Sequence, residues 1–233
     1  MVKLNKGNLR HAIAMIELIF ALVIMGIAMM SAPMLMSTAT NSTFVGIQQE
    51  GINEASTRIN MIMGYQWDEN DTDDKYIPPI LNVKAGASDL NQILLTSKRI
   101  GIPKESYRSF ILSDKNSSQL YASALGSDGG DSDDIDDFGN VSLSQVQAST
   151  SDYVEKNILI STAVAYNLDS VSGGYSQTTI QFSPFATSTD TTNIKSITVT
   201  LTSSSGVSEL DKTIILRGFS CNIGGYQLEE RSF

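Results

Sequence analysis

The chain has 233 residues, 16 Lys+Arg against 25 Asp+Glu, a formal net charge of −9, one cysteine and one histidine. An acidic chain lacks the excess of Lys and Arg that contacts nucleic-acid phosphates, so we expect no nucleic-acid partner. One cysteine excludes an intramolecular disulfide, and one histidine excludes a multi-histidine zinc site. No nucleotide-binding glycine motif is present. We therefore expect no enzymatic activity and no required cofactor.

The N-terminus combines a basic leader with an apolar run. Residues 1–12 carry Lys3, Lys6 and Arg10 and no acid, and residues 13–36 contain a single charge, Glu17. As a helix, 13–36 spans about 36 Å, more than the roughly 30 Å hydrocarbon core of a bilayer. The run is too long for a cleaved secretory signal. Basic residues before it predict a cytoplasmic N-terminus and an extracytoplasmic remainder.

Glu17 is the informative residue of this segment. A carboxylate within a bilayer costs a few kcal/mol, which makes it a functional-site hypothesis with a cationic partner. Cleavage between Ala12 and Ile13 creates an α-amino group four residues upstream. That ammonium on one subunit is suited to pair with Glu17 of a neighbour when helices bundle. The alternative is that Glu17 snorkels at the cytoplasmic interface.

The stretch 10–36 resembles the N-terminus of type IV pilins and of type II secretion pseudopilins. That family has a basic leader, a small residue before the cut, and a hydrophobic helix with Glu at its fifth mature position, which is Glu17 when counted from Ile13. Gly26 also falls where the family often has glycine. Two positions depart from the family: Ala12 stands where Gly is usual, and Ile13 where Phe or Met is usual.

The resemblance implies a sequence of events. A prepilin peptidase removes residues 1–12 and methylates the amino group of Ile13. The mature subunit waits in the inner membrane as a single-pass protein with a periplasmic C-terminal domain. An assembly platform with a cytoplasmic ATPase then extracts it into a filament. Helix 13–36 serves first as the membrane anchor, in contact with inner-membrane lipid, and then as the filament core among other pilin or pseudopilin subunits.

Residues 37–64 continue the helix in amphipathic form. Their apolar residues recur at close to the 3.6 period, at Phe44, Ile47, Ile52, Ala55, Ile59 and Ile62. An unbroken helix over 13–64 is about 78 Å long. We expect its stripe to pack on a downstream sheet; a free stalk helix is the alternative.

Residues 65–233 predict a β-rich extracytoplasmic globular domain. A short helix is expected over 88–98, and alternating or apolar runs predict strands at 107–112, 158–166, 175–185, 194–202 and 212–221. The fold class is thus α+β and pilin-like, with a long N-terminal helix packed on an antiparallel sheet of about four strands.

Two acidic loops are predicted, at 68–74 and 126–138. The second suggests a calcium site, because Ca²⁺ prefers clustered carboxylates on a flexible loop; its candidate ligands are Asp131, Asp133, Asp134, Asp136 and Asp137. A solvated acidic turn is the alternative, since the spacing fails the EF-hand template at Ile135. The run 133–138 also resembles one found in minor pilins of the mannose-sensitive haemagglutinin type. In a chain that cannot form a disulfide, calcium is a candidate for ordering the C-terminal region.

The sequence therefore predicts a structural minor pilin or pseudopilin. A different class remains open, namely a single-pass anchored binding module, calcium-dependent, that never assembles. A third hypothesis is a calcium-dependent adhesin at a filament tip.

Overall fold

The computed structural model describes residues 6–72, 78–90, 92–93, 98–99, 121–126, 130–139, 142–146, 157–203 and 208–225. The chain divides into two compact units, Met1–Glu50 and Gly51–Phe233. Each unit is described by itself below.

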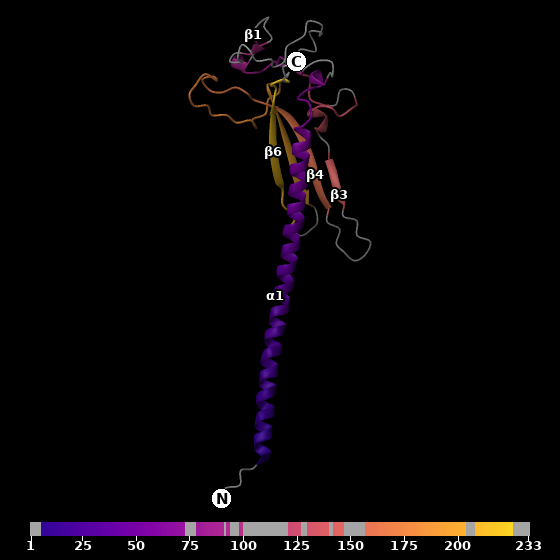
Figure 1. The fold of residues 1–233 in the computed structure, drawn as a ribbon, viewed down its shortest axis with the longest axis vertical. Coiled ribbons are helices and arrows are strands. Elements are labelled where there is room, and N and C mark those ends of the chain that lie inside the picture. The colour runs from indigo at the N-terminus through magenta and orange to yellow at the C-terminus, as the bar shows by residue number, and fades with distance from the viewer. Residues whose placement is uncertain are drawn as a thin grey trace, which may run out of the picture. The chain divides into compact units, whose positions relative to one another are not determined.

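A single helix, α1, runs from Lys6 to Ile62 over 57 residues and continues through Pro33 (Figure 1). The prediction of one helix over 13–64 is confirmed to within two residues at its C-terminal end. Threonine hydroxyls donate back to the carbonyl one turn earlier, as Thr38 does to Met34 at 2.9 Å. Such bonds satisfy hydroxyl groups without water, which suits a helix in apolar surroundings.

The principal sheet is antiparallel with the order β3-β4-β5-β6. Its strands are β3 (Ser142–Val146), β4 (Asn157–Asn167), β5 (Ile194–Ser203) and β6 (Ile214–Cys221). The expected strands at 158–166, 194–202 and 212–221 are confirmed as β4, β5 and β6. A two-stranded ribbon joins β1 (Gln92–Ile93) to β2 (Lys98–Arg99).

The end of α1 packs on the sheet within the second unit. Ala55, Ile59 and Ile62 of the predicted stripe are buried. The helix contacts three strands. Arg58 Nε donates to Thr162 Oγ1 of β4 at 2.7 Å. Gly51 packs against Leu201 of β5, and Ile59 packs against Gly218 of β6. The α+β class is therefore confirmed. The expected packing of the helix on about four strands needs correction: the helix contacts three long strands, and the fourth strand of the sheet, β3, is a five-residue strand at the edge beyond β4.

Two predicted elements are wrong. Instead of a helix over 88–98 there is a 3₁₀ turn, η2 (Ser88–Leu90), followed by the β1–β2 ribbon. The Asp89 carboxylate, which a helix here would use to bind N–H groups of its own first turn, accepts instead from the Tyr175 N–H at 2.8 Å. Residues 175–185 form a loop rather than a strand. The cause is that β4 and β5 pair directly over ten residues, which leaves 168–193 as their connection. The strand expected at 107–112 lies outside the described residues.

Candidate functional site

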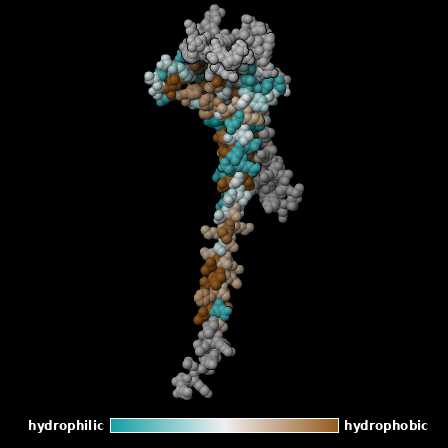
Figure 2. All heavy atoms as spheres, viewed as in Figure 1, coloured by the Kyte–Doolittle hydropathy of each residue, from teal (hydrophilic) through white to brown (hydrophobic). Residues whose placement is uncertain are grey.

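The N-terminal part of α1 presents an apolar surface. Every described side chain from Ala14 to Thr43 is exposed within the chain, and apolar residues gather along this part of the helix (Figure 2). By length and composition, the helix is suited to cross a membrane. Exposed apolar area of this extent is unfavourable in water and indicates a membrane or partner helices around it.

Glu17 is exposed within this apolar surface. The sequence holds no Lys, Arg or His between His11 and Arg58. Glu17 therefore has no cationic residue one helical turn away on its C-terminal side. The residue one turn away on its N-terminal side is Ile13, which is apolar. No residue of α1 between His11 and Arg58 can therefore supply the cation that neutralises Glu17 in an apolar environment.

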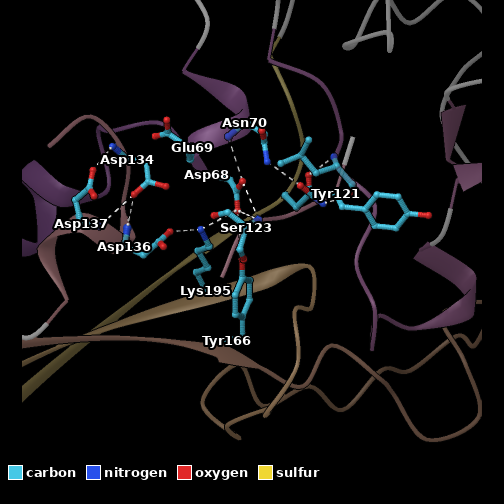
Figure 3. A network of polar contacts seen from close by, with 12 residues as sticks. Asp68, Glu69, Asn70, Tyr121, Ser123, Asp134, Asp136, Asp137, Tyr166 and Lys195 are labelled. Carbon is cyan, nitrogen blue, oxygen red and sulfur yellow. Dashed lines mark hydrogen bonds and ion pairs between the residues drawn. The ribbon is translucent and has the colours of Figure 1, made fainter. Parts of the chain in front are cut away.

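A buried ion cluster lies in the second unit, where β5 meets the two acidic loops (Figure 3). Lys195 is 0% exposed, and its Nζ lies 3.1 Å from Asp68 Oδ2 and in direct contact with Asp136 Oδ1. The same Nζ lies 4.7 Å from the Trp67 ring centroid and 5.2 Å from that of Tyr166. One buried lysine thus connects the loop after α1, the loop before β3, and the sheet.

The first acidic loop brings Asp68 to this lysine. Asp68 is 0% exposed and accepts hydrogen bonds from the Asn70 N–H, and from the N–H and hydroxyl of Ser123. The Tyr166 hydroxyl lies 3.2 Å from Asp68 Oδ2 and 2.8 Å from the Ser123 carbonyl oxygen. These donors stabilise a carboxylate in the interior and fix its position.

The second acidic loop also turns its carboxylates inward. Asp134 Oδ1 accepts from the N–H groups of Asp136 and Asp137 at 2.8 and 3.1 Å. Asp137 Oδ2 accepts in return from the N–H groups of Asp133 and Asp134. Asp136 Oδ2 accepts from the Gly126 N–H at 3.0 Å. The loop ends in the 3₁₀ turn η4 (Asp136–Phe138), and its neighbouring Ile135 is buried.

The cluster changes the protonation of its members. Burial raises the pKa of Asp134 to about 8, an effect that the Lys195 ammonium opposes and the Asp136 carboxylate reinforces. Burial alone lowers the pKa of Lys195, but Asp68 and Asp136 outweigh it and leave that pKa above its ordinary value. At neutral pH Lys195 is therefore charged and Asp134 is protonated. A proton on Asp134 Oδ2 suits that atom, which is buried and accepts no hydrogen bond in the described part of the chain.

Three of the five candidate calcium ligands have other partners in this structure, and Asp133 Oδ1 is buried without a hydrogen-bond partner among the described residues. Asp134, Asp136 and Asp137 bind backbone N–H groups or Lys195, and Asp131 is exposed. Among the described residues, no group of three or more acidic, histidine or cysteine side chains is arranged to hold a metal ion. Calcium binding at this loop stays a prediction.

Sequence reasoning missed Lys195, although a signal was present. Lys195 shares its parity along the strand with Ile197, Val199 and Leu201, which are all buried. A lysine at an inward position of a strand needs buried carboxylates. The two predicted acidic loops, 68–74 and 126–138, were the segments that could supply carboxylates to Lys195.

A second polar cluster holds the C-terminal end of β6. Asn222 is buried; its Oδ1 accepts from the Leu81 N–H at 3.0 Å and its Nδ2 donates to the Leu81 carbonyl oxygen at 2.8 Å. Nearby, Asp169 accepts from the N–H and the side-chain amide of Asn193. These amide contacts order a region in which the chain has no disulfide. Cys221 is half-buried at the end of β6.

No protein-family model, curated protein or solved structure matches this chain.

Proposed function

We propose that the chain is a structural minor pilin or pseudopilin. Its leader would be removed by a prepilin peptidase between Ala12 and Ile13, and the mature subunit would assemble through its N-terminal helix into a type IV pilus or a type II secretion pseudopilus. In this proposal the protein is not an enzyme and needs no cofactor.

The observation that carries the proposal is Glu17, alone and exposed on a long apolar helix. A plain membrane anchor gains nothing from this carboxylate, because an unpaired charge in hydrocarbon opposes insertion. A bundle of such helices gives it a role, because the α-amino group at the mature N-terminus of one subunit, Ile13 in this chain, neutralises the glutamate of another. The lack of any cation between His11 and Arg58 supports a partner of this origin.

The proposed location follows from the same segment. The helix is long and apolar enough to cross a membrane, and the basic residues Lys3, Lys6 and Arg10 precede it. In the proposal the N-terminus is cytoplasmic and the β-rich unit periplasmic until assembly, after which the subunit is in the filament. Prepilin peptidase, the inner-membrane assembly platform and other subunits are its partners.

Replacing Glu17 tests this role in cells that build the filament. We expect Glu17→Ala to insert into the membrane at the wild-type level. Its amount in the sheared filament fraction should fall by about tenfold, which corresponds to about 1.4 kcal/mol of lost interaction. Glu50→Ala, which removes an exposed carboxylate from the same helix, is the matched control. Wild-type assembly of Glu17→Ala would favour the anchored binding module that never assembles.

A further inference from the structure

The buried cluster around Lys195 places an amine against a carboxyl group, and the proposed function makes no use of this arrangement. Lys195 Nζ contacts Asp136 Oδ1, with both side chains almost fully enclosed. The rings of Trp67 and Tyr166 flank the amine and exclude water. Asp68 Oδ2 lies 3.1 Å from the same nitrogen. An amine nitrogen, the carboxyl carbon that it would attack once deprotonated, and an acceptor for its proton therefore meet in a dry interior.

We propose that Lys195 and Asp136 join in a covalent amide, a cross-link between their side chains formed by the folded protein itself. The inference is independent of the proposed function, because it depends only on groups of the second unit. It names a modification site and requires no other enzyme, oxidant or cofactor. The overall change is the condensation of one ammonium and one carboxylate to an amide and one water molecule.

The chemistry balances within the cluster. Asp68 takes one proton from the Lys195 ammonium, and Asp134 gives its proton to an oxygen of Asp136. The amine then attacks Asp136 Cγ, while the N–H of Gly126 stabilises charge on Oδ2. A second proton passes from the nitrogen to the departing oxygen. One C–N bond forms, one C–O bond breaks and water leaves, after which a proton moves from Asp68 back to Asp134.

The surroundings supply a group for each part of this step. Asp134 is 1% exposed and carries the elevated pKa described above, so a protonated acid is present at neutral pH. Its Oδ1 accepts from the backbone N–H of Asp136 at 2.8 Å, which holds the Asp134 side chain against the turn that carries Asp136 (Figure 3). The resting ammonium must lose its proton first. Asp68 Oδ2, 3.1 Å from the nitrogen, is the acceptor for that proton. The transfer costs free energy, because Asp68 and Asp136 hold the pKa of Lys195 above its ordinary value.

The cross-link would restrain two distant parts of the chain. Position 136 lies in the loop before β3 and position 195 near the start of β5, so the amide closes a ring through β3, β4 and their connections. A covalent ring of this kind limits the unfolded chain as a disulfide does. Unlike a disulfide, it is insensitive to reduction, and this chain has only one cysteine.

Mass spectrometry of full-length protein extracted in detergent tests the proposal. We expect a mass one water below that calculated for the same chain. Tryptic digestion should yield residues 116–156 joined to 157–212, uncleaved after Lys195 because its amine is acylated. Lys195→Arg should restore the missing water, whereas Lys212→Arg, at an exposed position, should retain the loss. A succinimide would lose water too, but it would persist in Lys195→Arg and open in mild alkali.

Unmodified peptides ending at Lys195 in the folded wild-type protein would overturn the proposal, and that outcome does not depend on any variant folding. The rate gives a second measure. Asp134→Asn removes the acid, so we expect the joined peptide to accumulate about 100-fold more slowly in freshly refolded protein. Accumulation at the wild-type rate would overturn the role assigned to Asp134. Neither result bears on filament assembly, which Glu17→Ala tests separately.

Discussion

The Asn222 side chain binds Leu81 through both of its backbone groups, accepting from the N–H at 3.0 Å and donating to the carbonyl oxygen at 2.8 Å. It thereby imitates a β-ladder pair between segments that are 141 residues apart. Both residues are buried, so water does not replace these bonds. The two hydrogen bonds of the Asn222 side chain thus hold the end of β6 against the loop at 78–87.

Replacing Asn222 should cost more stability than its size suggests. Asn222→Ala leaves two buried backbone groups of Leu81 without these partners, and we expect a loss of about 3 kcal/mol in the free energy of unfolding. Denaturation followed by the fluorescence of Trp67, the only tryptophan, measures it. Asn60→Ala, exposed on α1, is the control and should change little. An equal effect of both variants would contradict the account.

Gly218 sets how closely α1 approaches β6. A Cβ at this position would lie 3.0 Å from Ile59 Cγ2 and 3.1 Å from Met63 Sδ. Gly218→Val should therefore destabilise the protein by about 2 kcal/mol, despite the strand propensity of valine. The double variant Gly218→Val/Met63→Ala should regain part of the loss, because Met63 is partly exposed and its removal opens space. Additive effects of the two changes would show that this contact is not the cause.

The elevated pKa of Asp134 predicts how stability varies with pH. The folded-state pKa of about 8 exceeds the ordinary value of 3.8, so the folded protein holds a proton that the unfolded chain releases between these values. Stability should then decline as pH rises from about 4 to about 8 and level off above, with a slope of at most about 1.4 kcal/mol per pH unit from this group. Asp134→Asn should remove this component of the slope. Identical pH profiles for both proteins would contradict the assignment.

Removing calcium should leave the fold intact. The inward carboxylates of the second acidic loop already bind Lys195 and backbone N–H groups. We expect a strong chelator, compared with added Ca²⁺, to leave the thermal unfolding midpoint unchanged. A midpoint that rises with Ca²⁺ and falls on chelation would contradict this expectation and support the calcium hypothesis for Asp131 to Asp137.

Periodic patterns predicted the regular elements well. The buried face of α1 follows the stripe through Ala55, Ile59 and Ile62, and β5 follows the alternation of Ile197, Val199 and Leu201. These patterns succeed because burial on one face imposes a period of 3.6 on helices and 2 on strands. The run at 175–185 misled because Ile180 and Phe182 alternate, yet they are 42% and 40% exposed in a connection.

Local patterns gave only one sign of the ion cluster. Lys195 is 127 residues away from Asp68 in the sequence and 59 residues away from Asp136. Only the tertiary fold brings the three side chains together. Composition alone makes a Gly- and Asp-rich segment look solvated, because charged side chains are seldom buried without partners. The parity of Lys195 was the one local sign that such partners existed.

We propose above that this chain is processed and assembled as a pilin-like subunit. The most direct measurement is the intact mass and N-terminal sequence of the protein extracted from membranes of a host with an active prepilin peptidase. We predict a chain that begins at N-methylated Ile13. A chain that retains residues 1–12 would contradict the claim and leave the anchored module as the better account.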